Sequence, residues 1–93
     1  MKKKVTLNDI EYEVVKDYRD GFEEEAVVER ATDYFNDYDY IFGDWAYGKL
    51  RLKGFYEDKN PKANKINKYS SLDKYIEENC AYGCKYFVAK KNK

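Results

Sequence analysis

Two cysteines carry the most reactive side-chain type in this sequence. Cys80 and Cys84 are separated by three residues. Two thiolates are too few for a closed zinc site, which uses four ligands, and the spacing differs from the C-x-x-C motif of thioredoxin-like redox pairs. Three interpretations stay open: small apolar residues in the core, a redox pair, and a metal site shared between subunits. We adopt the first, because free cysteines are usually buried.

Histidine is absent from all 93 residues. Its absence removes the commonest general base, the commonest metal ligand and every Ser–His or Cys–His catalytic pair. Asp37, Asp39 and Asp44 could offer carboxylates to a hard cation, but no calcium-loop spacing supports this, and Asp44 suits a turn. We therefore expect no enzyme, no metal and no cofactor. The remote alternative is a histidine-free enzyme with Asp44, Arg51 and a cysteine in one pocket.

A basic strand beside clustered aromatic residues is the better functional candidate. Three cations alternate with Leu50 and Leu52, which predicts one basic and one apolar strand face. Strict alternation also places Phe55 on the basic face, and a cationic strand with an exposed ring is how sheet platforms stack nucleic-acid bases. The more ordinary alternative is a β-bulge at Gly54, which would turn Phe55 inward and Tyr56 outward. The candidate binding residues are Trp45, Tyr47, Lys49, Arg51, Lys53 and Phe55.

Turn residues and capping signals predict the elements around this strand. Asn8-Asp9 separates two alternating runs, which is typical of a hairpin. Asp20 and Glu23 have the spacing of a capping box for a helix that continues to about Phe35. The apolar face predicted for this helix is Val27, Val28, Ala31, Tyr34 and Phe35.

Ser70 and Asp73 have the same capping-box spacing. They predict a second helix that ends near Cys80 and is capped by Gly83. Its core-facing residues should be Leu72, Tyr75 and Ile76. The predicted strands are 5–7, 10–14, 38–43, 49–56 and 84–89.

The predicted order is ββαββαβ, an α+β fold with a mostly antiparallel sheet packed with two helices. The two helices either cover one face of the sheet or lie at one side of a curled sheet. The chain length predicts a single domain, 1–93. Residues 57–69 contain the only proline and almost nothing apolar, so we expect a flexible loop there, and we expect 90–93 to be a frayed tail.

The charges sum to zero but are segregated along the chain. Residues 8–44 hold 13 acids and 3 bases, a net charge of −10, whereas residues 45–72 hold 7 bases and 2 acids, a net charge of +5. A neutral total argues against non-specific nucleic-acid binding, which favours a positive domain, but it allows one basic face. Opposite charges in the two halves could also drive self-association or docking into a larger assembly.

Several segments together resemble the YutD-like family of small proteins from Gram-positive bacteria. They are NDYDYIFGDWAYGKLRLKGFY at 36–56, the opening that contains Val5-Thr-Leu-Asn8 and Glu11-Tyr-Glu-Val-Val15, and the ending from Asn79 to Lys91. The resemblance covers nearly the whole chain. It implies a single cytoplasmic α+β domain without an established activity, and it supplies no catalytic residues.

These observations favour a non-catalytic binding module. Its partner would be single-stranded nucleic acid or an acidic protein surface, and the alternative is a structural or assembly protein. No small-molecule substrate is implied. Acidic residues soon after Lys2–Lys4 interrupt any signal-peptide core, and no run reaches transmembrane length. We therefore expect a cytoplasmic protein without a membrane partner, whose cysteines are reduced.

Overall fold

The computed structural model describes residues 3–46, 48–79 and 85–92. Five strands and two α-helices follow one another in the order predicted, ββαββαβ, which confirms the α+β fold. Two short 3₁₀ turns, Asp33–Asp37 and Tyr69–Ser71, precede β3 and α2. The elements are β1 (Lys3–Leu7), β2 (Ile10–Tyr18), α1 (Glu24–Arg30), β3 (Tyr40–Ala46), β4 (Lys49–Phe55), α2 (Leu72–Asn79) and β5 (Tyr86–Lys91).

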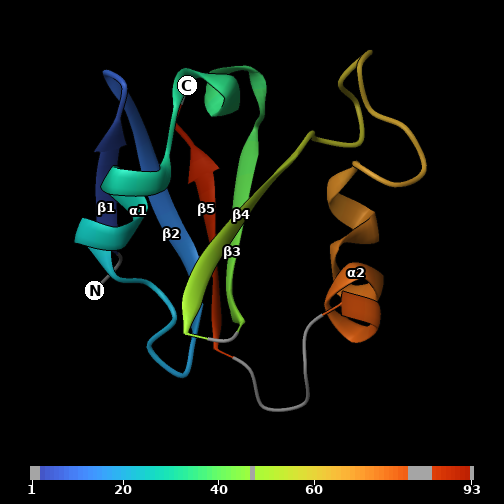
Figure 1. Cartoon of the computed structure of the whole chain (residues 1–93). Helices are drawn as coiled ribbons and strands as arrows, with labels where there is room; N and C mark the ends of the chain where they lie inside the picture. The colour runs from blue at the N-terminus through green and yellow to red at the C-terminus, as the bar shows by residue number, and fades with distance from the viewer. Residues whose placement is uncertain (1–2, 47, 80–84, 93) are drawn as a thin grey trace.

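The strands form one antiparallel sheet in the order β1-β2-β5-β3-β4 (Figure 1). The last strand of the chain, β5, therefore lies in the middle, where it pairs with β2 on one side and β3 on the other. The two hairpins occupy the outer positions. As a result, β1 and β4 are the two edges of the sheet.

The first hairpin is confirmed. Asn8 and Asp9 both have positive φ angles, 53° and 67°, as the central residues of a type I′ turn require. Alternation then sends Val5 and Tyr12 to the interior, where they are 3% and 0% exposed. Beyond Val14 the pairing of β2 with β5 shifts by one residue, so Lys16 and Tyr18 lie on the opposite face from Tyr12 and Val14.

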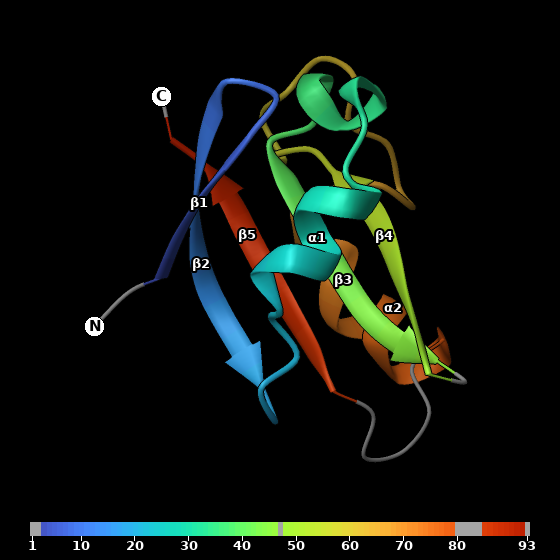
Figure 2. The ribbon, with the colours of Figure 1, turned by 60° about the vertical axis from the view of Figure 1, so that its left-hand side comes forward.

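The two helices cover opposite faces of the sheet, so both predicted arrangements, two helices on one face and two helices at one side of a curled sheet, are wrong. Helix α1 packs Val27 into a cluster of interior residues that come from all five strands, with Leu50 of β4 among them. Helix α2 packs Leu72 against a second cluster formed by β3, β4 and β5. Figure 2 shows α1 in front of the sheet and α2 behind β3 and β4, with β1 and β2 extending past α2. Strands β3 and β5 are buried on both faces, which explains their nearly continuous apolar sequences.

Helix α1 is shorter than predicted, and its capping box is wrong. Asp20 has a φ angle of 57° in the preceding turn, and Glu23 occupies the N-cap position without a side-chain capping bond. The helix ends at Arg30, because Ala31 and Thr32 are extended. Val28 inside α1 and Tyr34 after it, both expected on the apolar face, are 51% and 65% exposed.

Residues 57–69 form a series of turns between β4 and α2. The buried carboxylate of Asp39 accepts hydrogen bonds from the backbone N–H of Glu57 and from the Asn60 side chain, at 2.9 and 3.0 Å. Near its end the segment returns to the sheet, where Lys68 forms a parallel bridge with Tyr56. The flexibility expected for this loop stays a prediction.

Helix α2 faces the core with the predicted residues, Leu72, Tyr75 and Ile76. Its capping box is wrong, because a 3₁₀ turn precedes the helix and the Ser70 N–H donates to Asp58. At the end of the chain, β5 continues through Lys91, where a frayed tail was expected from residue 90. The Asn92 N–H then donates to the Glu11 carbonyl, so the sheet also holds the residue after β5.

Candidate functional site

The basic strand β4 pairs with β3 without a bulge. Ile41 stands opposite Gly54, and Tyr40 stands opposite Phe55, in one unbroken register. The bulge at Gly54 is therefore wrong, and Phe55 shares a face with Arg51 and Lys53. Gly54 has a different role, since a Cβ there would lie 2.2 Å from the Tyr38 ring. Because Gly54 has no side chain, the Tyr38 ring can lie directly against the strand.

Phe55 nevertheless offers no stacking surface, because helix α2 covers it. Its exposed fraction is 0%, and Phe42 and Tyr75 contact its ring edge-on. Lys53 lies along the margin of this cluster, with Nζ 5.6 Å from the centroids of both Phe55 and Tyr75. Burial of this ring contributes about 2–3 kcal/mol to folding. The expectation of an exposed ring on the basic face is thus wrong.

Trp45 lies on the other face of the sheet. The register places it opposite Leu50, one residue out of phase with Arg51. Its Nε1–H donates to the Gly21 carbonyl at 2.7 Å, and Lys85 lies 4.8 Å above the ring. This half-buried indole therefore anchors the turn before α1 and does not extend the basic face. Tyr47, Cys80 and Cys84 lie outside the described residues.

Arg51 is tied to a buried carboxylate. Its Nε and Nη2 donate to the two oxygens of Asp44 at 3.2 and 2.5 Å. The Asp44 side chain is 3% exposed, whereas that of Arg51 is 51% exposed. Asp44 is therefore a strand residue, and the predicted turn lies beyond it. A bidentate pair of this kind is strong and directional, so Arg51 has a structural role in addition to any binding role.

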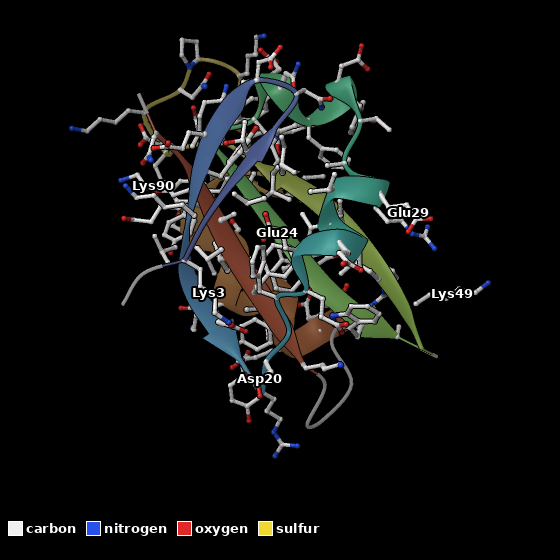
Figure 3. The ribbon with its side chains drawn as sticks, turned by 90° about the vertical axis from the view of Figure 1, so that its left-hand side faces the viewer. Lys3, Asp20, Glu24, Glu29, Lys49 and Lys90 are labelled. Carbon is white, nitrogen blue, oxygen red and sulfur yellow. The ribbon has the colours of Figure 1, made fainter. Side chains whose placement is uncertain are left out.

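A hollow of about 340 Å³ wraps around the outer edge of β4. Residues Arg51 to Gly54 form its floor, Tyr34 and Tyr38 rise on the α1 side, and Tyr75 rises on the α2 side. A second hollow of about 310 Å³ continues along Leu50 to Leu52 toward Arg30. We call the first hollow, with the neighbouring Lys49, the β4 groove. Figure 3 shows Lys49 projecting away from the end of β4.

The sequence did not predict Tyr34 and Tyr38 of the β4 groove as binding residues, because it placed Tyr34 on the apolar face of a helix and Tyr38 at the start of a strand. Their hydroxyls are 3.0 Å apart. The hydrogen bond to Tyr34, together with partial burial, raises the pKa of Tyr38 to about 12. The Tyr38 phenol is therefore protonated at neutral pH. The density of aromatic residues between Asp33 and Tyr40 was the available signal.

The aspartates near the groove are occupied by protein donors. Asp37 accepts hydrogen bonds from Lys62 at 2.6 Å and from the Tyr56 hydroxyl at 3.0 Å, which hold the pKa of this carboxyl below its usual value. Asp39 accepts from Glu57 and Asn60. Among the described residues, no group of three or more potential ligands could hold a metal ion. Asp44 and Arg51 do line one hollow, but the cysteine that the enzyme alternative requires is outside the described residues.

A second aromatic and basic surface lies at β2 and β5 on the same side of the sheet as α2. Tyr18 and Tyr86 stack at 5.0 Å with an angle of 18° between their planes. Arg19 lies 5.5 Å from the Tyr18 centroid, and Lys16 lies 5.7 Å from that of Tyr86. Tyr18 is 41% exposed. The one-residue shift after Val14 creates this pairing, so strand alternation alone did not predict it.

Comparison with known proteins agrees with this fold. A family model described as "Putative antitoxin YutD-like" matches residues 6–90. The chain is 52% identical over 87 residues to the "Putative antitoxin YutD" of Bacillus subtilis (strain 168), covering 94% of this chain and 96% of the relative. The solution NMR structure of B. subtilis protein yutD matches with a TM-score of 0.81 and 49% identity, over 98% of this chain and 83% of that chain. In the part of the chain that the structure describes, no helix has the length and apolar character needed to cross a membrane.

Proposed function

This chain belongs to the YutD-like family, and from that premise we propose that it is a non-catalytic module that binds a protein partner through the β4 groove. The groove combines three cations with three tyrosines. Lys49, Arg51 and Lys53 would attract an acidic surface, and Tyr34, Tyr38 and Tyr75 would bury its apolar atoms. Tyrosine and arginine are the residue types that most often dominate binding energy at protein interfaces.

The observation that carries this proposal is the hollow of about 340 Å³ at an open sheet edge. It brings together residues from the turn before β3, from β4 and from α2, which are far apart in the sequence. Tyr34 is 65% exposed, an unusually open position for an aromatic side chain. A protein partner that covered this edge would bury both the ring and the strand.

The name of the relatives supports a protein partner. An antitoxin opposes a toxin, and the B. subtilis relative carries that name with the qualification "Putative". Binding and masking another protein requires complementary surface and no reacting groups, which agrees with the absence of histidine. A cytoplasmic location remains part of this proposal.

Single-stranded nucleic acid is the second candidate, on a different surface. The stacked Tyr18–Tyr86 pair with Lys16 and Arg19 has the composition of a base-stacking platform. The two candidates use different surfaces, one at the outer edge of β4 and one on β2 and β5, so variants can separate them. Self-association through the segregated charges is the third alternative, and sedimentation at low and high salt tests it.

The experiment is capture from a cell extract with and without nuclease. We expect a protein to be retained in both cases and to be lost with Lys49→Glu combined with Lys53→Glu. Arg51 is left intact, because its replacement would strand the buried carboxylate of Asp44. Lys16→Glu combined with Arg19→Glu is the matched control and should retain the protein. Loss of capture after nuclease, or in the control alone, would instead support nucleic acid on the Tyr18–Tyr86 face.

A further inference from the structure

The geometry of the sheet points to the way in which a partner binds. We propose that the partner contributes a short, extended, acidic segment that pairs with β4 at Leu52 and lengthens the sheet by one strand. This inference rests on the proposed function, since it specifies the partner of the same groove. Strand addition of this kind draws affinity from backbone hydrogen bonds and specificity from alternating side chains.

The directions of the backbone hydrogen bonds along β3 identify the residues of β4 whose N–H and C=O groups face away from the sheet. The Trp45 N–H donates to Lys85, and the Asp39 carbonyl accepts from Lys91, so odd-numbered residues of β3 bond toward β5. Even-numbered residues of β3 therefore bond toward β4, where Arg51 and Lys53 are among their partners. The remaining residues of β4 direct their N–H and C=O groups away from the sheet. These residues are Leu50, Leu52 and Gly54.

The chain itself already adds a segment at this edge. Tyr56 is in phase with Leu52 and Gly54, and its N–H donates to the Asn67 carbonyl at 2.8 Å. Its carbonyl accepts from the Tyr69 N–H at 2.7 Å. This intramolecular pairing is a parallel bridge with Lys68, and it ends just before the groove begins. The partner's segment would pair with the same edge of the sheet at Leu52, beside the segment that pairs at Tyr56.

Exposure places the centre of the pairing at Leu52. Leu50 is 3% exposed and Gly54 is buried beneath Tyr38, whereas Leu52 is partly open. Among the described residues no strand other than β3 pairs with β4. We therefore expect two backbone bonds at Leu52 to need the least rearrangement, whereas bonds at Leu50 and Gly54 would require side chains to move aside.

The side chains flanking Leu52 predict the sequence of the segment. Residues directly opposite in a sheet share a face. The residue opposite Leu52 would enter the α1 side, where Phe35 and Tyr34 offer apolar contact. Its two neighbours would lie on the α2 side beside Arg51 and Lys53. The complementary pattern is therefore acidic–apolar–acidic.

A second copy of this chain fits the edge poorly. Antiparallel pairing of β4 with itself about Leu52 would bring Arg51 opposite Lys53 in both directions. Like charges directly opposite each other destabilise a sheet. The charge pattern therefore selects a different, acidic protein segment.

A short blocked peptide that alternates glutamate and valine is the direct probe. In amide-resolved NMR, we expect the Leu52 amide signal to shift and its hydrogen exchange to slow. The same peptide N-methylated at its central valine should lose most of its affinity, because it lacks one backbone donor. A peptide with lysine in place of glutamate should not bind. Equal binding by the N-methylated peptide, or shifts confined to β1 or to Tyr18, would overturn strand addition.

Leu52→Pro is the matching variant of the protein. The proline removes an N–H that points outward, which an edge strand tolerates, and it should abolish peptide binding. Thr6→Pro is the control, because Thr6 lies on the other edge strand in the corresponding outward phase. If Leu52→Pro still captures the partner while the Lys49 and Lys53 double variant does not, the groove function stands and strand addition is wrong. The N-methylated peptide gives the answer even if Leu52→Pro fails to fold.

Discussion

The two edges of the sheet carry similar residues and use them differently. On β1, Lys3 and Lys4 are exposed, and Lys3 bridges Asp17 at 2.7 Å across the surface. On β4, Arg51 bridges Asp44 at 2.5 Å, but this acid is 3% exposed. Lysines on an edge strand discourage accidental strand pairing. Charge alone therefore does not distinguish a docking edge from a protected one.

The difference arises from what lies beside each strand. Strand β1 pairs in a tight hairpin with β2, and its cations stay in water. Strand β4 lies between the turn before β3 and helix α2, whose tyrosines build a hollow around it. The comparison teaches that an edge becomes a candidate interface when neighbouring elements add apolar walls to its open backbone.

The largest expected effect concerns the packing under each edge. Phe55→Ala should lower the free energy of unfolding by about 3–5 kcal/mol, because it empties the cluster beneath α2. Val5→Ala under β1 removes only two methyl groups and should cost about 1–2 kcal/mol. Urea denaturation measures both. Equal losses would show that α2 does not depend on the Phe55 ring.

Removing the cation from each ion pair tests the comparison most directly. Arg51→Met should cost about 2–3 kcal/mol, because Asp44 would be left buried with its charge unpaired. Lys3→Met should cost much less, because both members of that pair reach solvent. The methionines keep the apolar stems. A Lys3→Met variant as unstable as Arg51→Met would contradict the distinction between the edges.

Gly54→Ala tests the local geometry of the β4 groove. The new methyl group would collide with the Tyr38 ring, at a cost of about 1–2 kcal/mol. It should also separate the Tyr38 and Tyr34 hydroxyls, so the pKa of Tyr38 should fall from about 12 toward its usual value. Ultraviolet titration of the phenols follows this change. An unaltered titration would mean that Tyr38 does not need the space above Gly54.

The smallest expected effect is a pH dependence at β1. Burial opposes ionisation of Asp17, but hydrogen bonds from Lys3 and from the Phe22 N–H outweigh it and hold the Asp17 pKa below 3.8. A lowered pKa in the folded state stabilises the protein above about pH 4, and this stabilisation is lost as pH falls through the folded value. NMR titration of the Asp17 carboxyl carbon should show a low midpoint that rises in Lys3→Met. A midpoint that stays unchanged in the variant would remove Lys3 as a cause.

Part of the fold followed from local signals. The Asn8-Asp9 turn, the strict alternation from Lys49 to Lys53 and the apolar spacing of Leu72, Tyr75 and Ile76 each depend on neighbours in sequence. The capping box predicted at Asp20 was wrong because the same local signal suits more than one structure. A polar residue before a charged run also suits a turn with positive φ, which Asp20 adopts, and the Trp45 Nε1–H donates to the carbonyl of the next residue, Gly21.

The candidate site was less predictable. Arg51 and Lys53 were found from their alternation, but Tyr34, Tyr38 and Tyr75 come from other elements and reach the same edge only in the folded chain. The sequence also suggested that Trp45 and Phe55 would join one platform. The pairing of β3 with β4 places these two rings on opposite faces, and helix α2 covers the second.

The sequence by itself determined the alternation of the first hairpin and of β4 from Lys49 to Lys53, the segregation of charge and the membership of the family, because each of these depends on residues that are neighbours in the chain. Only the tertiary structure decided which cations remain available. That choice depends on which face each helix covers, and long-range packing sets it. Arg51 and Lys3 look alike in the sequence, and the difference between them is the burial of the carboxylate that each one meets.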